Sequence, residues 1–299
     1  MGWSALCVSV LIAAIGQQGD RGMQPDYAVS EDVSPAEAVY IRSTDGVYVG
    51  AGLRKPEGDG PFPGVLLVHG GLGGAGVEGQ VGSALRGRVQ NALLKEGYVI
   101  LCTDYRRHDF GRREIDDVIA AFEHLRQLPE VDPKRVGIVG GSHGGYLTMR
   151  AIATIRPAAA VSFAGLVDIG LLFSGRAPRE PKGERPGAAE EISWELYQRF
   201  GGTPEEKPEQ YRDISVHPYV DDIESPLLYC VGTADRLQAH GEMLIELMKK
   251  KGKTCELALF PDMPHGFYWG RGPEGKPLAE FENCLRKTIE FLNRHVRDR

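Results

Sequence analysis

The stretch Val136-Gly137-Ile138-Val139-Gly140-Gly141-Ser142-His143-Gly144-Gly145 decides how the chain folds. A short apolar run ends in a glycine-rich turn around one serine, and a helical pattern begins at Tyr146. This is a G-x-S-x-G pattern between a strand and a helix, and it predicts a strained turn that projects the serine from the carboxyl edge of a sheet. The flanking glycines let strand and helix pack closely, and the helix N-terminus supplies N–H groups for negative charge. A purely structural glycine turn is the alternative.

A serine hydroxyl becomes a nucleophile when a base takes its proton and an acid orients that base. For a serine on such a turn, the expected chain order is serine, acid, histidine. His265 follows the last predicted strand, where its loop would return over Ser142, and Asp235 leaves the carboxyl end of the strand before it. We therefore expect Ser142, Asp235 and His265 to form a catalytic set. The alternatives are a turn-capping role for His265 and a helix N-cap for Asp235.

The same chemistry needs N–H donors aimed at the oxygen that becomes negatively charged. The backbone N–H of His143, directly after the serine, is one candidate. The second is expected in the loop His69-Gly70-Gly71-Leu72 after the third strand, as the N–H of Leu72 or Gly71. The side chain of His69 is expected to brace this loop.

Short apolar runs alternate with helical patterns along most of the chain. The predicted strands lie at 38–41, 47–53, 65–68, 98–102, 136–139, 159–163, 227–231 and 256–260. The predicted helices lie at 85–95, 115–128, 146–155, 240–251 and 278–295. Thr44-Asp45-Gly46 has the chemistry of a hairpin turn between the first two strands. The alternation predicts an α/β fold with a mostly parallel, eight-stranded sheet flanked by helices.

Residues 167–220 interrupt the alternation with a stretch rich in proline, glycine and charge and an aromatic helical piece at 194–200. An insertion this long within a compact domain is usually a lid or a binding element. We expect Trp194 and Tyr197, with Phe267 and Tyr268, to line a pocket for an apolar acyl or alcohol group. The alternative is that these aromatic side chains only pack the insertion on the core.

The N-terminal residues raise the question of targeting. Residues 3–16 form an apolar run that is short for a membrane span, and Ala14-Ile15-Gly16 offers small residues for cleavage before Gln17. We expect a signal peptide at 1–16, with an N-terminal anchor as the alternative, then a linker at 17–35 and one domain at 36–299. A cleaved signal would make the protein exported, secreted or periplasmic, and otherwise it would be cytoplasmic. No other segment has the pattern of a membrane span.

Composition and charge narrow the classes of function. The 299 residues are 42% hydrophobic and 25% charged, as is usual for a globular protein, and their net charge of −6 argues against nucleic-acid binding. The spacing of the five cysteines matches no zinc site. Cys102 and Cys230 fall in predicted strands, so we expect free core thiols, although four cysteines could pair after export. We expect no metal or organic cofactor, and the sequence leaves the oligomeric state open.

With these residues in place, the chain resembles an α/β-hydrolase, specifically the catalytic domain of the prolyl oligopeptidase (peptidase S9) family, near the dienelactone-hydrolase-like esterases. Besides the catalytic set, the resemblance rests on three motifs: Asp104-Tyr105-Arg106, Gly201-Gly202-Thr203-Pro204-Glu205 and Gly232-Thr233-Ala234-Asp235. It implies a serine hydrolase that works through an acyl-enzyme and acts on an ester or a short peptide.

Two departures from the family pattern bear on the substrate. Oligopeptidases of this kind carry a β-propeller ahead of the catalytic domain, and the 35 residues before Ala36 are too few to supply one. The His69-Gly70-Gly71-Leu72 loop also lacks the tyrosine at its start that those peptidases use as an oxyanion donor. We therefore expect a carboxylesterase for small esters. A peptidase for short peptides is the first alternative, and a non-catalytic binding scaffold is the second.

Overall fold

The computed structural model describes residues 35–173, 177–181, 187–270 and 279–298. The expected signal peptide at 1–16 lies outside these residues, and so does the expected linker at 17–35 except for Pro35. No helix in the described part of the chain is long and apolar enough to cross a membrane.

One eight-stranded sheet forms the centre of the fold, as predicted. Its strands are, in spatial order, β1 (Glu37–Arg42), β2 (Tyr48–Arg54), β4 (Val99–Thr103), β3 (Phe62–Val68), β5 (Val131–Gly141), β6 (Ala159–Phe163), β7 (Leu227–Gly232) and β8 (Cys255–Phe260). The β1–β2 and β2–β4 pairs are antiparallel, and every other neighbouring pair is parallel. The carboxyl ends of β3, β5, β7 and β8 therefore meet at one edge of the sheet.

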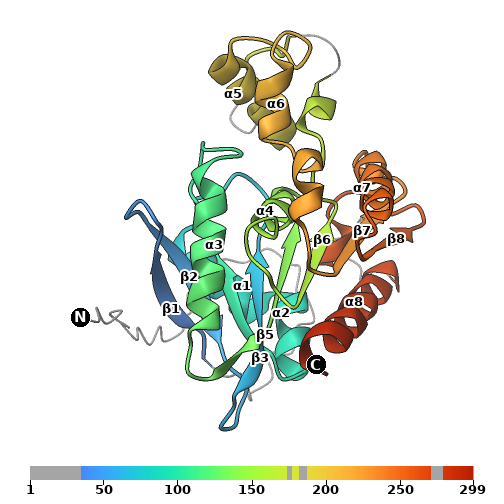
Figure 1. The fold of residues 1–299 in the computed structure, drawn as a ribbon. Coiled ribbons are helices and arrows are strands. Elements are labelled where there is room, and N and C mark those ends of the chain that lie inside the picture. The colour runs from blue at the N-terminus through green and yellow to red at the C-terminus, as the bar shows by residue number, and fades with distance from the viewer. Residues whose placement is uncertain (1–34, 174–176, 182–186, 271–278, 299) are drawn as a thin grey trace, which may run out of the picture.

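Helices cover both faces of the sheet. Figure 1 shows α3 (Arg113–Arg126) and α4 (His143–Ala151) in front of it and α1 (Gly76–Arg86) and α2 (Arg88–Lys95) behind it. α7 (Gln238–Lys250) packs on β7 and β8, and α8 (Ala279–Leu292) continues into a π-helical turn at Asn293–Arg297.

The single helix predicted at 85–95 is wrong. The chain forms two helices there, separated at Gly87, whose backbone is extended (φ −67°, ψ 133°). A Cβ on this glycine would lie 1.9 Å from Gln90 Oε1, so the break lets the glutamine side chain fold back over the junction.

The insertion at 167–220 forms a small helical cap at one end of the molecule (Figure 1). It contains a 3₁₀ turn at Ile169–Leu172, α5 (Ala188–Phe200), α6 (Pro208–Asp213) and a 3₁₀ turn at His217–Asp222. The two ends of the cap meet at Val167, whose carbonyl accepts from the N–H groups of Val216 and His217 at 2.8 and 3.3 Å. The imidazole Nδ1 of His240 on α7 accepts in turn from the Val167 N–H at 3.0 Å.

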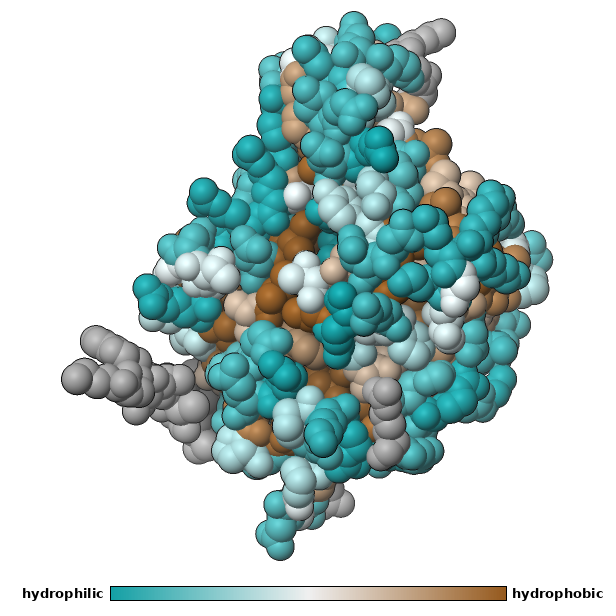
Figure 2. Space-filling model, viewed as in Figure 1, coloured by the Kyte–Doolittle hydropathy of each residue, from teal (hydrophilic) through white to brown (hydrophobic). Residues whose placement is uncertain are grey.

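The burial of each strand depends on its position in the sheet. The strands β3, β4, β6 and β7 are buried nearly throughout, and β5 is buried from Val136 onward, whereas the edge strands β1 and β8 each have exposed residues. Figure 2 shows a mostly hydrophilic surface on this side of the molecule, with hydrophobic residues visible in the hollows between projecting elements. The four cysteines in the described residues are free.

Candidate active site

Ser142 occupies a strained turn between β5 and α4. Its backbone has φ 55° and ψ −120°, a conformation that residues with a side chain rarely adopt. The glycines around it have no room for a side chain: a Cβ on Gly140 would lie 2.1 Å from the Gly144 oxygen, and one on Gly144 would lie 2.3 Å from the Val68 oxygen. The predicted strained turn and close strand–helix packing are both present.

The structure brings Ser142, His265 and Asp235 together from three loops at the carboxyl edge of the sheet. His265 Nε2 lies 2.9 Å from Ser142 Oγ, and His265 Nδ1 lies 2.7 Å from Asp235 Oδ2. The other carboxylate oxygen of Asp235 accepts from the backbone N–H of Leu237 at 2.9 Å. Because both oxygens are held and the carboxylate is buried, the imidazole is fixed with Nδ1 toward the acid and Nε2 toward the serine.

Tyr268 is a further residue that contacts His265, the expected base. Its hydroxyl lies 3.3 Å from His265 Nε2, and its ring meets the imidazole edge-on and stacks on Phe163. Burial raises the pKa of the Tyr268 phenol, so the hydroxyl keeps its proton. Sequence reasoning placed Tyr268 in a substrate pocket, and its position three residues after His265 gave no sign of this contact.

The loop predicted to supply the second oxyanion donor lies against the serine. A Cβ on Gly70 would be 3.2 Å from the Cβ of Ser142, so the backbone of this loop approaches Ser142 closely. The Tyr105 hydroxyl fixes the loop by donating to the carbonyls of His69 and Gly71 at 3.1 and 2.8 Å. The N–H of His143, with that of Leu72 or Gly71, stays our prediction for the donor pair.

His69 braces this loop through Asp104. His69 Nε2 lies 3.0 Å from Asp104 Oδ1, and the same carboxylate accepts from the N–H groups of Gly74, Gly76 and Tyr105. Burial works to raise the pKa of Asp104, but hydrogen bonds from His69 and from these backbone groups outweigh it, so the pKa is lowered. The carboxylate therefore stays ionised and organises the loop.

The side chain of His143 contacts Glu114 and takes no part in the hydrogen bonds that join Ser142, His265 and Asp235. Its ring is buried, with Nε2 3.0 Å from Glu114 Oε2, and the other oxygen of Glu114 accepts from the Gly111 N–H at 2.7 Å. Tyr105 stacks on the same imidazole. His143 thus fixes the start of α4 through its ring, which leaves its backbone N–H as the group offered beside Ser142.

The four aromatic residues expected in the substrate pocket have different positions. Tyr268 lines the cleft beside the triad, but Phe267 is fully buried against Phe260. Trp194 and Tyr197 stack on each other along α5, while the cleft reaches this helix at Ala188. The cap therefore lies near the cleft through the start of α5 and not through its aromatic pair.

The triad opens into a cleft of about 840 Å³. Its walls are the 69–71 loop, the turn at Ser142, the segment 265–270 and the junction of α1 and α2. Trp269 forms part of the wall and packs close to the serine turn, since a Cβ on Gly141 would lie 2.6 Å from its ring. The volume is that of a small-molecule site.

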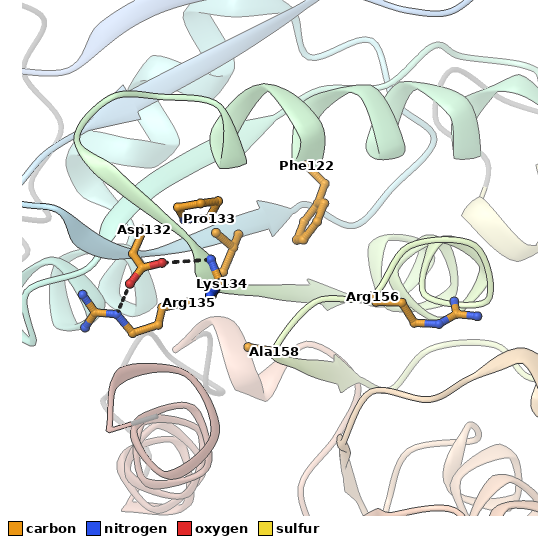
Figure 3. A pocket seen from close by; sticks show the side chains of 8 residues that line it. Phe122, Asp132, Pro133, Lys134, Arg135, Arg156 and Ala158 are labelled. Atoms are coloured by element: carbon orange, nitrogen blue, oxygen red, sulfur yellow. Dashed lines mark hydrogen bonds and ion pairs between the residues drawn. The ribbon is translucent and has the colours of Figure 1, made fainter.

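A second hollow, of about 490 Å³, lies where β5 and β6 begin (Figure 3). Its arginines are already paired, Arg135 with Asp132 at 2.9 Å and Arg156 with Glu224 at 3.0 Å. Ser142 lies beyond the opposite end of β5, so this hollow is remote from the triad. Among the described residues, no cluster of three or more histidine, cysteine, aspartate or glutamate residues could hold a metal ion.

Comparison with known proteins agrees with this architecture. The pattern of the prolyl oligopeptidase family, Peptidase_S9, matches residues 93–296. The uncharacterized peptidase YuxL of Bacillus subtilis is 28% identical over 283 residues, which cover 84% of this chain and 39% of YuxL. The uncharacterized peptidase YtmA of the same organism is 26% identical over 275 residues, which cover 86% of this chain and 96% of YtmA.

Solved structures share the fold at low sequence identity. A puromycin-hydrolyzing peptidase of Mycobacterium tuberculosis superposes with a TM-score of 0.69 at 22% identity, over 88% of this chain and 39% of that one. Carboxyl esterase 2 of Tuber melanosporum gives 0.69 at 18% identity, over 92% of this chain and 90% of that one. This chain spans less than half the length of YuxL and of the mycobacterial peptidase. The family pattern covers most of the chain, and the fold agrees with it, so the chain belongs to the prolyl oligopeptidase (peptidase S9) family of α/β-hydrolases.

Proposed function

We propose that the protein is a serine hydrolase that cleaves small carboxylic esters through an acyl-enzyme on Ser142. The observation that carries this proposal is the unbroken set of hydrogen bonds from Ser142 Oγ through His265 to buried Asp235, at 2.9 and 2.7 Å. A nucleophile, a base and an orienting acid in this arrangement are what acyl transfer requires.

In the proposed reaction, His265 Nε2 takes the proton of Ser142 as Oγ attacks the substrate carbonyl. Asp235 accepts from Nδ1–H and stabilises the imidazolium that forms. The backbone N–H of His143 and an N–H of the 70–72 loop receive the negative oxygen. His265 then gives its proton to the leaving group, and it deprotonates the water that releases the acid from Ser142.

Ester hydrolysis is the function that these groups support best. An alcohol leaves a tetrahedral intermediate more readily than an amine does, so an ester needs little beyond the nucleophile, the base and the oxyanion donors. The cleft of about 840 Å³ suits a small molecule. These groups would also serve a short peptide, and this second candidate is favoured by the naming of YuxL and YtmA as peptidases.

The test is kcat/KM for short-chain p-nitrophenyl esters beside aminoacyl and prolyl p-nitroanilides, with Ser142→Ala as the control. Faster ester turnover that disappears in Ser142→Ala would support the proposal, and faster anilide turnover would favour the peptidase. A fluorophosphonate probe should label Ser142 in the wild type. A protein that is not labelled and turns over neither substrate would be a binding scaffold, and activity that survived Ser142→Ala would overturn the mechanism.

A further inference from the structure

The cleft extends well beyond the triad, to the junction of α1 and α2. There it is lined by polar side chains that the proposed reaction does not use: Gln80, Ser83, Arg86 and Gln90. We call this part of the cleft the junction recess. Because it is continuous with the space at Ser142, a substrate attacked by the serine can place another of its groups there.

Three polar groups of the junction recess have no hydrogen-bond partner among the described residues, and one of them is Gln90 Oε1. Gln80 is 2% exposed, yet its amide makes no hydrogen bond to any of them. Arg86, an exposed residue in the last turn of α1, makes no hydrogen bond or ion pair with them either. The neighbouring arginine differs, because Arg88 is paired with Glu282 and lies over the ring of Phe281. A polar group that lines a cleft without a protein partner is available to a ligand.

Glycines make room for these polar groups. The guanidinium of Arg86 folds back over Gly82, where a Cβ would lie 2.4 Å from Nη2, and both residues line the cleft. α1 ends and α2 begins at Gly87, and Gln90 Oε1 lies over this glycine. The recess therefore offers to one space a guanidinium and an amide that no described residue binds.

The charge of the cleft indicates what these groups bind. Among the described residues that line it, His69, Arg86, Arg88 and His265 carry or can carry positive charge, and none is acidic. This contrasts with the net charge of −6 of the whole chain. An anion of the size of a carboxylate matches a guanidinium and an amide donor at once.

We propose that the junction recess binds a carboxylate of the substrate, held by Arg86 and Gln80, so that the enzyme prefers esters or peptides bearing a free carboxylate. This rests on the proposed function, because it assumes that the substrate reacts at Ser142. The carboxylate can belong to the acyl part, as in a monoester of a dicarboxylic acid, or to the leaving group, as at the C-terminus of a peptide.

Matched substrate pairs test the preference and identify the source of the carboxylate. On the acyl side, mono-p-nitrophenyl glutarate is compared with its neutral methyl ester. On the leaving side, 4-acetoxybenzoate is compared with 4-acetoxybenzamide. We expect kcat/KM to favour the anionic member about 10-fold in one pair, and this preference should shrink as salt is added, since charge attraction is screened.

Substitutions connect the preference to the recess. Arg86→Gln should remove most of the roughly 10-fold preference, as expected for a lost ion pair. Gln80→Leu should reduce the preference in the same direction. The matched control is Arg126→Gln on α3, which removes an exposed arginine whose ion partner is Glu123 and should change neither pair.

Equal turnover of both members in both pairs, or an unchanged preference in Arg86→Gln, would overturn the proposal. Titration calorimetry with glutarate gives a readout without turnover: wild type should bind it, and Arg86→Gln should bind it about 10-fold more weakly. If Ser142 is unlabelled by fluorophosphonate but glutarate still binds through Arg86, the hydrolase proposal fails and the carboxylate site stands. If Ser142 reacts and glutarate does not bind, the carboxylate site fails alone.

Discussion

Lowering the pH from about 7 to about 5 should weaken the fold through one buried imidazole, that of His240. The ring is 3% exposed, and its Nδ1 accepts from the N–H groups of Val167 and Asp168 at 3.0 and 3.3 Å. Both bonds need the lone pair of Nδ1, so the ring must be neutral with its proton on Nε2. Protonation would break the contact that ties the base of the cap to α7.

The magnitude follows from the pKa of His240 in the folded protein. Burial lowers it from 6.5 to about 4; Arg236 acts in the same direction, and Asp168 and Asp235 oppose it. Between pH 6.5 and about 4, the unfolded chain therefore binds a proton at His240 that the folded protein does not bind. The free energy of unfolding falls as the pH is lowered through this range. Between about pH 7 and 5 the free energy of unfolding should drop by about 2 kcal/mol from this group alone.

Urea unfolding at both pH values, followed by tryptophan fluorescence, measures the drop. The matched variant is His240→Asn, whose amide oxygen can accept the same N–H groups but does not titrate. The wild type should lose about 2 kcal/mol more than the variant over this pH range. Equal losses in the two proteins would refute the reasoning, because they would show that the histidine titrates alike in the folded and unfolded states.

Three further substitutions test the site. Asp235→Asn should lower kcat for p-nitrophenyl acetate about 10⁴-fold, because the amide no longer holds the imidazole in its working tautomer; a loss below about 10-fold would contradict this role. Tyr268→Phe removes the hydroxyl 3.3 Å from His265 Nε2 but keeps the stacked ring, so kcat should fall about 3- to 10-fold with KM unchanged, the worth of one hydrogen bond; an unchanged kcat would show that the hydroxyl does not assist the base. Gly144→Ala places a Cβ 2.3 Å from main-chain oxygens at the end of β3 and should lower the free energy of unfolding by about 2 kcal/mol or more; a variant as stable as wild type in urea would refute it.

The grouping of Ser142, Asp235 and His265 at one edge of the sheet could be predicted from the sequence because its signals are local. The glycines around Ser142 report a turn without room for side chains, and the strand endings before Asp235 and His265 report one edge of a parallel sheet. In a parallel sheet, residues that follow successive strands come together whatever separates them in the chain. The structure accordingly places the three side chains within hydrogen-bond distance of one another.

Other elements left no pattern in the sequence. α1 was not predicted because it packs on β2 through backbone: a Cβ on Gly50 would lie 2.5 Å from the Val77 nitrogen, and one on Gly52 would lie 2.5 Å from the Gln80 oxygen. Contacts between backbones need glycine and not an apolar stripe, so helical periodicity is weak there. Phe267 was misplaced because the 3₁₀ turn at Phe267–Trp269 sends this ring into the core and Tyr268 toward the base.

The junction recess could not be predicted from the sequence, because the absence of a partner is a property of the folded chain. Arg86 and Gln80 look like ordinary polar residues of a helix until the structure places both in the wall of the cleft that contains Ser142. The recess also makes the choice between ester and peptide measurable. A preference for the anionic acyl group would indicate monoesters of dicarboxylic acids, whereas a preference for the anionic leaving group would indicate a peptide bound by its C-terminal carboxylate. Whether the preferred carboxylate belongs to the acyl group or to the leaving group therefore indicates which of the two proposed reactions the cleft favours.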